Sequence, residues 1–410
     1  MNLNIIDIIN RKRLGLELNN AEIEYAFNGY LNNTIKDYQM SALLMAICIN
    51  GMTDQEIFDL VDIFIKSGEC LDLSSLEGIK VDKHSTGGIG DKITLIIGPI
   101  VASLGVIVPK MSGRGLGYTG GTIDKLESIP GFKVNLTEEE FIQELKDVSF
   151  AVTSQTSNLC PLDKVIYALR DVTGTTESIP LIATSIMSKK IAGGADKILI
   201  DIKCGEGALI KNYEDALKLK DIMERIGNFY NRETICEVTD MNIPLGSNIG
   251  NALEVMEAIE VLKGKKSRLT DLSIQLASEM VKVSLNISLE EAKTKVINSL
   301  ESGMALEKFY QFVKYQGGKI EKLKVSEFKQ EIKSDKTGVI TNIKALNIGK
   351  LSCSLGAGRI NKEDTIDYGV GIILNKQVGD VVNIGDTLFT LYKKNSNNIT
   401  LNISEYYEIN

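Results

Sequence analysis

We expect an α/β protein that has a helical lobe, a larger α/β lobe with a mostly parallel sheet, and a small β-rich C-terminal domain. Three observations predict this class. The first 67 residues show only helical periodicity. From about residue 78, short β-type runs alternate with glycine-rich turns and helices, and after about residue 330 the chain is again rich in β-type runs. A length of 410 residues suits two or three domains.

The helical lobe is expected to comprise residues 1–67 and 160–195. In 20–30 and 38–49 apolar residues recur every three or four positions, the period of an amphipathic helix. A capping box at 53–56 begins a third helix. Because 161–171 and 178–191 return to the helical pattern, we expect them to fold back onto the N-terminal helices.

The α/β lobe is expected to comprise residues 68–159 and 196–330, with the β-rich domain at 331–410. Each of four β-type runs leads into a glycine-bearing turn and then a helix; they are residues 79–81, 106–108, 197–202 and 235–239. Four such units predict a mostly parallel sheet with helices on its faces. Ligands of these sheets bind at the carboxyl ends of the strands, so the glycine turns should converge on one edge.

Composition and charge exclude several classes of protein. Hydrophobic residues make up 43% of the chain and charged residues 24%, as in an ordinary globular protein. The net charge of −8 lacks the broad basic footprint of a nucleic-acid-binding protein. No apolar run approaches the ~20 residues that a membrane span requires, and the N-terminus does not resemble a secretory signal. We therefore expect a cytoplasmic protein that binds neither nucleic acid nor membrane.

The cysteines and histidine give little support for a metal centre. The six cysteines are far apart and form no C-x-x-C pair, which argues against a zinc site and against a disulfide framework. The chain has a single histidine, His84, so a centre built on several histidines is excluded.

Two glycine-rich segments predict an anion site. The first glycine loop (83–94) and the second glycine loop (112–122) each follow a β-type run and carry hydroxyl side chains. Glycine lets a backbone approach an anion closely, and N–H groups at a helix N-terminus attract it. Neither loop is a Walker loop or a dinucleotide fingerprint, so no organic cofactor is expected. One such loop is often only a turn, whereas two favour a phosphate site.

Four polar side chains invite a functional or an ordinary interpretation. His84, beside Lys83 and Ser85, is a natural proton donor at neutral pH or a plain packed residue. Ser185 and Lys189 are four apart in a predicted helix and would project from one face with the similarly spaced Ile182 and Ile186. Polar and apolar pairs side by side suit a flat heterocycle, but an ordinary amphipathic helix has the same pattern. Arg170 could likewise be a surface arginine.

Five motifs carry a resemblance that decides between these interpretations. They are residues 81–91 (VDKHSTGGIGD), 110–117 (KMSGRGLG), 119–127 (TGGTIDKLE), 167–175 (YALRDVTGT) and 185–190 (SIMSKK). Together they resemble the pyrimidine nucleoside phosphorylase and thymidine phosphorylase family, and the similarity runs in order from about residue 3 to 395. The resemblance implies a pentosyltransferase, a homodimer joined by its N-terminal helices, that cleaves pyrimidine nucleosides such as uridine, thymidine and deoxyuridine with inorganic phosphate.

The resemblance also implies roles for individual residues. Phosphate would be bound by Lys83, Ser85, Thr94, Ser112 and Thr122, with Lys110 beside them on the 2′ side of the sugar. The edge of the base would meet Arg170, Ser185 and Lys189, and its faces would be enclosed by Leu116, Tyr167, Ile182 and Ile186. His84, Arg170 and Lys189 would be the catalytic residues, with His84 near O2 of the base. Closing the two lobes would join phosphate to base.

This chain departs from the family at several positions. Tyr118 stands where the family usually has histidine. The family often binds a potassium ion, and the matching positions are Gly90, Lys92, Leu245, Asn248 and Glu257, where the ammonium of Lys92 suits a neighbouring cation only if it points away. Lys110 resembles the broad-specificity branch. The alternatives are a thymidine-specific phosphorylase, a related phosphoribosyltransferase, and a non-catalytic protein of the same fold that binds nucleoside or phosphate.

Overall fold

The computed structural model describes residues 3–115, 117–118, 120–156, 158–361 and 364–410. The chain divides into two compact units. Unit 1 comprises residues 1–75, 155–198 and 213–236, and unit 2 comprises residues 76–154, 199–212 and 237–410. The segment 331–410, for which the sequence predicts a domain of its own, lies within unit 2. Each unit is described by itself.

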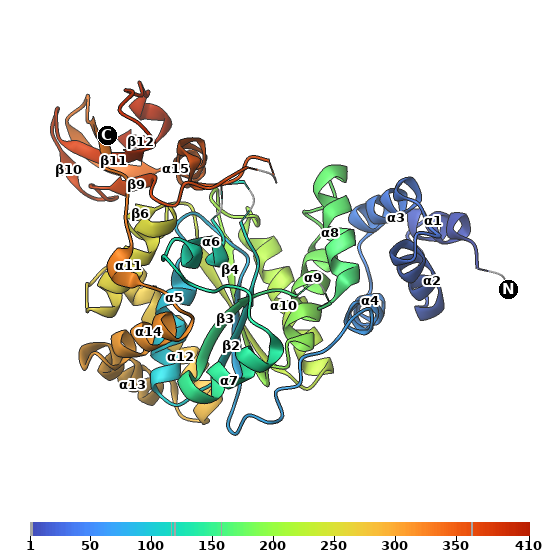
Figure 1. Cartoon of the computed structure of the whole chain (residues 1–410). Helices are drawn as coiled ribbons and strands as arrows, with labels where there is room; N and C mark the ends of the chain where they lie inside the picture. The colour runs from blue at the N-terminus through green and yellow to red at the C-terminus, as the bar shows by residue number, and fades with distance from the viewer. Residues whose placement is uncertain (1–2, 116, 119, 157, 362–363) are drawn as a thin grey trace. The chain divides into compact units, whose positions relative to one another are not determined.

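Unit 1 is helical, as the sequence predicts (Figure 1). Its helices are α1 (Ile5–Arg13), α2 (Asn20–Leu31), α3 (Asp37–Asn50), α4 (Asp54–Lys66), α8 (Pro161–Thr173), α9 (Ile179–Ala192) and α10 (Tyr213–Phe229). Leu162, Ile166 and Leu181 join side chains of α1–α4 in one apolar core. The expected return of the two later helical segments to the N-terminal helices is therefore confirmed.

The predicted capping box begins α4 and also anchors a buried ion pair. The backbone N–H of Glu56 donates to Thr53 Oγ1 at 3.3 Å, and that of Thr53 donates to Glu56 Oε2 at 2.7 Å. Lys12 Nζ donates to both oxygens of the same carboxylate, at 2.7 Å to Oε1 and 2.8 Å to Oε2. The backbone N–H of Leu18 also donates to Oε1, at 2.9 Å. Because both charges are buried, these bonds compensate their lost hydration and fix α1 against α4.

The strands of the α/β lobe form two linked groups. β1 (Val81–Ser85), β4 (Lys197–Cys204) and β5 (Glu233–Asp240) form a sheet in the order β1-β4-β5. β2 (Val108–Ser112) pairs in parallel with β3 (Phe150–Ser154), a strand that the sequence analysis missed. A parallel bridge between Lys80 and Ile107 links the groups. The observed β1 and β2 begin about two residues later than predicted and extend to Ser85 and Ser112.

Helices cover these strands. They are α5 (Ile93–Ser103), α6 (Thr122–Glu127), α7 (Glu138–Val148), α11 (Asn251–Leu262), α12 (Arg268–Leu285), α13 (Leu289–Glu301) and α14 (Met304–Tyr315). The apolar helix α5 is central, since it contacts α11, α12, α13 and α14 as well as β2 and β3 (Figure 1). Residues 93–102 are all buried, which explains why this segment is mostly apolar.

The C-terminal region is antiparallel. One sheet has the order β6-β9-β11-β7, from β6 (Asn248–Ile249), β9 (Gly371–Leu374), β11 (Thr387–Lys393) and β7 (Phe328–Lys333). The other has the order β10-β8-β12, from β10 (Val381–Val382), β8 (Gly338–Ile343) and β12 (Tyr407–Ile409). The short helix α15 (Ala345–Ser352) follows β8. The β-rich C-terminal prediction is confirmed, and β6 shows that a mid-chain segment joins it.

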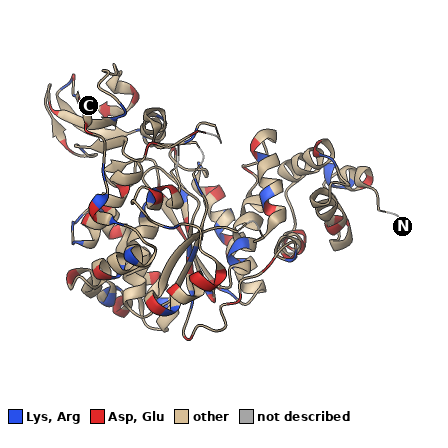
Figure 2. Ribbon diagram, in the orientation of Figure 1, with Lys and Arg blue, Asp and Glu red and all other residues tan. Residues whose placement is uncertain are grey.

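Charged residues are distributed over both units. Basic and acidic residues are interspersed along the helices of both units (Figure 2). Within the described part of the chain, no helix has the length and apolar character that crossing a membrane would require.

A buried carboxyl group on α7 gives a prediction about stability. Glu144 is fully buried, and neither of its oxygens has a hydrogen-bond partner among the described residues. Burial raises its pKa from 4.5 to about 9. Since the unfolded chain ionises near the lower value, this group lowers stability increasingly as the pH rises from 4.5 towards 9, by roughly 1.4 kcal/mol per pH unit at most.

We therefore expect Glu144→Gln to stabilise the protein more at pH 8 than at pH 5, as measured by urea unfolding at several pH values. Glu138→Gln, an exposed position on the same helix, is the matched control and should show no such trend. A difference between Glu144→Gln and wild type that is the same at all pH values would contradict the assignment.

Candidate functional site

The first glycine loop places two of its predicted residues on one face of β1. Lys83 and Ser85 alternate with His84 along the strand, so Lys83 and Ser85 point to one side and His84 to the other. His84 is the next-to-last residue of β1, just before the glycines of the loop. Ser85 Oγ donates to Asp91 Oδ2 and accepts from Gly87 N–H at 3.2 Å. Thr94 is buried in the first turn of α5.

Lys83 belongs to a compact cluster of buried charges. Its Nζ lies 3.5 Å from Asp201 Oδ2, which also lies 2.7 Å from Lys203 Nζ. Burial alone would raise the pKa of Asp91, but the ammonium groups of Lys83 and Lys203 outweigh burial and hold it well below its usual range. Lys83 Nζ makes no hydrogen bond to a described residue, although it is buried. A buried ammonium whose donors are not used is suited to an anion.

The second glycine loop begins where β2 ends. Lys110 and Ser112 are two residues apart on β2 and therefore share a face of the strand. Lys110 is buried, and its Nζ donates to Met111 O at 2.7 Å. Thr122 is the first residue of α6, at the far end of the loop. Leu116, predicted to enclose a heterocycle, lies outside the described residues.

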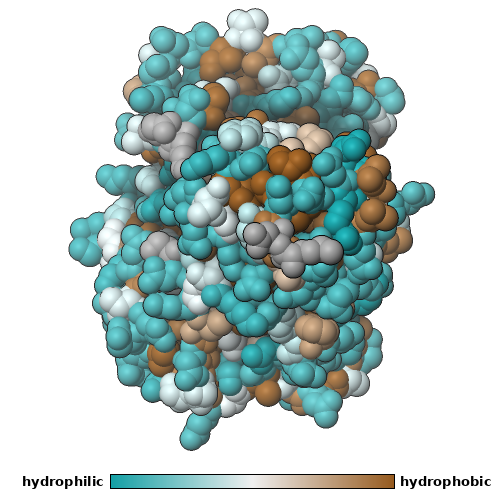
Figure 3. Space-filling model, turned by 90° about the vertical axis from the view of Figure 1, so that its right-hand side faces the viewer, coloured by the Kyte–Doolittle hydropathy of each residue, from teal (hydrophilic) through white to brown (hydrophobic). Residues whose placement is uncertain are grey.

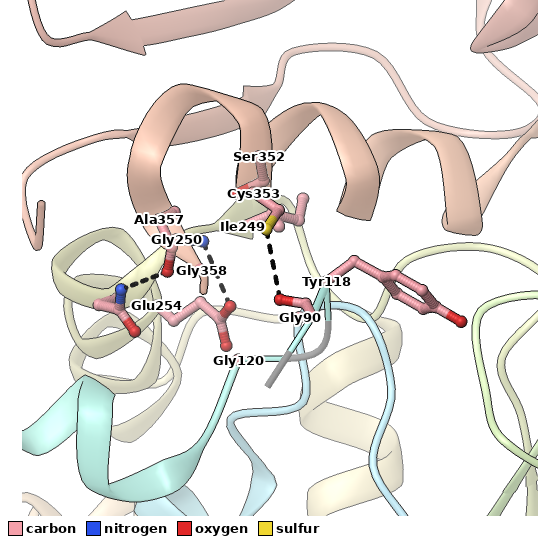
Figure 4. A pocket seen from close by; sticks show the side chains of 12 residues that line it. Gly90, Tyr118, Gly120, Ile249, Gly250, Glu254, Ser352, Cys353, Ala357 and Gly358 are labelled. Carbon is pink, nitrogen blue, oxygen red and sulfur yellow. Dashed lines mark hydrogen bonds between the residues drawn. The ribbon is translucent and has the colours of Figure 1, made fainter. Parts of the chain in front are cut away.

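The two glycine loops meet at a common hollow, as predicted from the strand ends. Gly90 of the first loop and Gly117, Tyr118 and Gly120 of the second line a small pocket (Figure 4). The start of α11 and residues 352–353 and 357–358 complete its lining. The phenol of Tyr118 points away from this cavity (Figure 4), so it cannot donate a proton into it in this conformation.

Two charged residues that the sequence analysis missed hold the second loop in place. Asp124 Oδ2 accepts from Gly115 N–H at 2.7 Å, and its Oδ1 accepts from Arg359 Nη1 at 2.9 Å. Arg359 O in turn accepts from Gly117 N–H at 2.8 Å. Cys353 Sγ also donates to Gly117 O at 3.4 Å (Figure 4). The loop is thus fixed by α6 on one side and by the C-terminal region on the other.

In unit 1, Arg170 is a buried residue and not the surface arginine that the sequence left open. It lies in the last turn of α8, and its guanidinium donates to the carbonyl oxygens of Thr175, Thr176 and Leu181 at 3.0, 2.9 and 3.2 Å. These bonds use three of its five N–H donors. They tie the segment after α8 to the first turn of α9, and they hold the cation in one orientation.

Ser185 and Lys189 lie on one face of α9, as their spacing predicts. Lys189 Nζ donates to Ser185 Oγ at 2.8 Å and also to Asp163 Oδ2. Asp163, which the sequence analysis did not identify, is seven residues before Arg170 and so lies two turns away on the same side of α8. That spacing is the signal that could have revealed it. The carboxylate neutralises Lys189 and fixes the position of its ammonium.

Apolar and aromatic groups accompany this polar pair. Ile182 and Ile186 are both buried on α9, whereas Tyr167 on α8 is partly exposed. The guanidinium carbon of Arg170 lies 5.6 Å from the centroid of the Tyr167 ring, within the range of a cation–π contact. The α8–α9 set (Tyr167, Arg170, Ile182, Ser185, Ile186 and Lys189) therefore comes together within unit 1.

The residues predicted to hold potassium do come together in unit 2, but the side chain of Lys92 lies among them. Its Nζ is 2.8 Å from both Leu245 O and Glu257 Oε2. Asn248 and Gly90 are close by, since Asn248 N–H donates to Glu257 and Gly90 O accepts from Lys92 N–H. An ion bound to the same two oxygens would coincide with the ammonium, so the residues present do not fit potassium. Among the described residues, no cluster of three His, Cys, Asp or Glu side chains could hold a metal ion.

Comparison with protein families gives matches along most of the chain. A model of the helical bundle domain of a glycosyl transferase family matches residues 6–68, and a model of the α/β domain of that family matches residues 77–306. A model of the pyrimidine nucleoside phosphorylase C-terminal domain matches residues 339–410.

Comparison with individual proteins gives relatives of nearly the same length. The pyrimidine-nucleoside phosphorylase of Bacillus subtilis is 50% identical over 414 residues, which cover 99% of this chain and 95% of that protein. The enzyme of the same name from Staphylococcus haemolyticus is 49% identical over 417 residues, covering 99% and 96%. Among solved structures, anthranilate phosphoribosyltransferase from Thermus thermophilus is similar with a TM-score of 0.59, at 17% identity over 76% of this chain and 99% of that one. This last likeness shows the fold alone.

The anchoring of the second loop can be tested directly. Asp124→Ala should speed amide hydrogen exchange at Gly115 and Gly117 by about tenfold or more, because hydrogen bonds to a charged group contribute about 1.5–3 kcal/mol each. The measurement is exchange followed by mass spectrometry or NMR. Asp221→Ala, at an exposed position on α10, should leave both amides unaffected. Unchanged exchange in Asp124→Ala would contradict the anchoring role.

Proposed function

Because the chain belongs to the pyrimidine-nucleoside phosphorylase family, we propose that its two residue sets carry out the phosphorolysis of pyrimidine nucleosides. The products are the free base and a pentose 1-phosphate. The observation that carries the assignment of the residues is the contact between Ser185 and Lys189, 2.8 Å apart on α9. A pyrimidine edge alternates carbonyl oxygens with a ring N–H, and a hydroxyl beside an ammonium offers an acceptor and donors for that edge.

Phosphate is assigned to the glycine loops. The buried ammonium of Lys83 supplies a charge whose hydrogen bonds are not used by described residues. Thr94, Ser112 and Thr122 supply hydroxyl donors in the same two loops, and the hydroxyl of Ser85, which donates to Asp91 in this structure, would have to turn to donate to phosphate. Ser85 donates to Asp91 and accepts from Gly87 N–H, so the backbone of the first glycine loop is held in place before phosphate arrives. Such preorganisation lowers the cost of binding and of the reaction.

The chemical step needs no protein nucleophile. A phosphate oxygen bonds to C1′ of the sugar while the bond from C1′ to N1 breaks, and the electron pair leaves with the base, which then takes up a proton. Negative charge therefore develops on the pyrimidine, and Arg170 and Lys189 stabilise it. One unit charge pair at 4 Å with an effective dielectric constant of 20 is worth ~4 kcal/mol. His84 is assigned to the proton shared with O2 of the base.

The buried contacts around Arg170 and Lys189 hold these two cations in fixed positions. Arg170 is held by three carbonyl oxygens and Lys189 by Asp163, so neither side chain must reorganise when charge develops. Desolvation lowers the pKa of Arg170, yet guanidinium remains protonated in proteins. Ile182, Ile186 and Tyr167 supply the apolar surface that a planar ring requires.

We assign broad specificity for the sugar to Lys110. The proposal is supported by the position of Lys110 on the same face of β2 as Ser112, one of the hydroxyl side chains that we assign to phosphate. Two alternatives are a thymidine-specific phosphorylase and a protein that only binds nucleoside or phosphate. The expected cytoplasmic location belongs to the same proposal.

The function is tested by mixing the protein with uridine, thymidine or deoxyuridine and measuring the release of uracil or thymine with and without phosphate. We expect phosphate-dependent release from all three. Release from thymidine alone would favour the thymidine-specific alternative, whereas no release from any of them would leave only the binding role.

Arg170→Ala should lower turnover by ~10²–10³, the range for losing one preorganised contact with the transition state. Lys164→Ala is the matched control, since Lys164 is an exposed cation on the same helix. Turnover of Arg170→Ala at the wild-type level would refute the role. Because Arg170 also holds loop carbonyls, the thermal midpoint of each variant is measured beside its kcat and KM.

The homodimer is also proposed, through an exposed apolar stripe on unit 1. Tyr38, Met45 and Ile49 are spaced seven and four residues apart on α3, so they share a face, and Ile6 on α1 is exposed as well. Tyr38 and Ile49 are 74% and 75% exposed, which is unusual for such large apolar groups. On the face of the molecule drawn in Figure 3, hydrophobic residues lie in small groups among hydrophilic ones.

Ile49→Glu should convert the dimer to a monomer, measured by light scattering after size-exclusion chromatography, because a charge would be buried in the contact. Ile384→Glu, at an equally exposed isoleucine of unit 2, should remain a dimer. A monomeric wild-type protein, or a dimer that survives Ile49→Glu, would argue against this contact.

A further inference from the structure

The side chain of Lys92 enters the interior of unit 2 from the first glycine loop. Lys92 is the residue before α5, and its side chain is completely buried. A lysine at a helix N-terminus is unfavourable for the helix dipole, and it is usually in solvent. Its burial here therefore requires a specific compensating environment.

That environment consists of oxygen atoms from two other segments. Nζ donates to the carbonyl oxygen of Leu245 and to Glu257 Oε2, each at 2.8 Å. Glu257 is itself buried in the middle of α11, where it also accepts from the backbone N–H groups of Ser247 and Asn248 at 2.7 and 2.9 Å. One ammonium thus links the first glycine loop, the turn before β6, and α11.

Two glycines keep the space around the ammonium small. Gly90 has φ of +77°, and a Cβ there would lie 2.5 Å from Leu245 O and 3.4 Å from Lys92 Nζ. Gly246 has φ of +79°, and a Cβ there would lie 2.5 Å from Glu257 Oε2 and 2.9 Å from Lys92 Nζ. Both backbone conformations and both close approaches require glycine. The chain is therefore shaped around a cation at this position.

The charge of Glu257 is matched to this cation. Burial by itself would raise the pKa of Glu257, but the adjacent Lys92 ammonium and the backbone N–H groups outweigh it and lower the pKa. The pair is neutral as a whole, so adding a second cation to the same oxygens would bring like charges together without a further carboxylate.

We propose that the Lys92 ammonium is a built-in substitute for a monovalent metal ion, so that this protein needs no potassium to hold the first glycine loop against Leu245 and Glu257. An ammonium group and a potassium ion carry the same charge and are similar in size. The two oxygens at 2.8 Å are the contacts that either would make. Because the cation is covalently part of the chain, the stability of this contact does not depend on the potassium concentration.

The test compares the full-length protein in potassium chloride with the protein in choline chloride at equal ionic strength. The wild-type thermal midpoint should agree between the two salts to within about 1 °C, since no ion is bound by the folded state alone. Phosphorolysis of uridine should also be equal in both. The thermal midpoint does not depend on the proposed activity, so it tests Lys92 even if no nucleoside is cleaved.

Variants of Lys92 test whether an ion can bind where the ammonium lies. Lys92→Thr should lower the midpoint in choline by roughly 5–10 °C, because it leaves Glu257 buried without its partner. Potassium should restore at least half of that loss by filling the vacated space. Lys92→Met, which fills the space with methylene and methyl groups, should lose stability in both salts and gain nothing from potassium. Lys263→Thr at the exposed end of α11 is the control, and its midpoint should not respond to potassium.

Two results would overturn the proposal. One is a wild-type midpoint or activity that rises in potassium, which would show that the ion binds despite Lys92. The other is a Lys92→Thr variant that potassium fails to rescue, which would show that the ammonium is only an ion-pair partner. Should Lys92→Thr fail to fold in choline, the wild-type comparison still decides the first point, and refolding of the variant in potassium decides the second.

Discussion

The structure of unit 2 depends on neutralising several ammonium groups that are buried beside the glycine loops. Lys92 is paired with Glu257, Lys125 with Glu254, and the pair Lys83 and Lys203 with Asp201. Three of these four ion pairs join two different elements or loops, whereas Lys203 and Asp201 share β4, and α11 supplies both Glu254 and Glu257. Since an unpaired buried charge costs several kcal/mol, these pairs admit little variation in how α5, α6 and α11 meet the strand ends. The two glycine loops, which connect these elements, are therefore held in place as well.

The same constraint separates structural charges from those available to a substrate. Lys92 satisfies its donors with a carbonyl and a carboxylate, and Lys125 donates to Gly120 O. Lys83 lies at a longer 3.5 Å from its carboxylate and makes no hydrogen bond to a described residue. Of these buried lysines, Lys83 is therefore the one best suited to receive an oxyanion. In unit 1 the cations are held differently, with Arg170 bound by carbonyl oxygens and Lys189 by Asp163. In the proposed phosphorolysis, both arrangements would fix the positive charge before the reaction creates a negative one.

A reader of the sequence could predict the fold class and most of the elements, because periodicity and capping are local. The capping box at Thr53, the helices at 20–30 and 38–49, and the strand–loop–helix units all follow from short-range pattern. The sequence pattern of β3 alone is too weak to predict a strand, and pairing with β2 establishes it. The bounds of β1 and β2 differ from the predicted ones by about two residues because pairing with neighbouring strands decides where a strand lies. The spacing of Ser185 and Lys189 predicted their shared face for the same local reason.

The sequence by itself determined which residue types stand at the glycine loops and on α9, and through its motifs the family to which the chain belongs. Only the tertiary structure decided which charges meet. Asp163, Asp201 and Arg359 are distant in sequence from Lys189, Lys83 and the second loop, and no local rule brings them together. Whether the Lys92 ammonium points towards Leu245 and Glu257 or away from them is likewise a matter of packing, because the partners lie more than 150 residues along the chain. Ion pairs between distant segments form only when the chain folds, so the sequence of a single segment does not predict them.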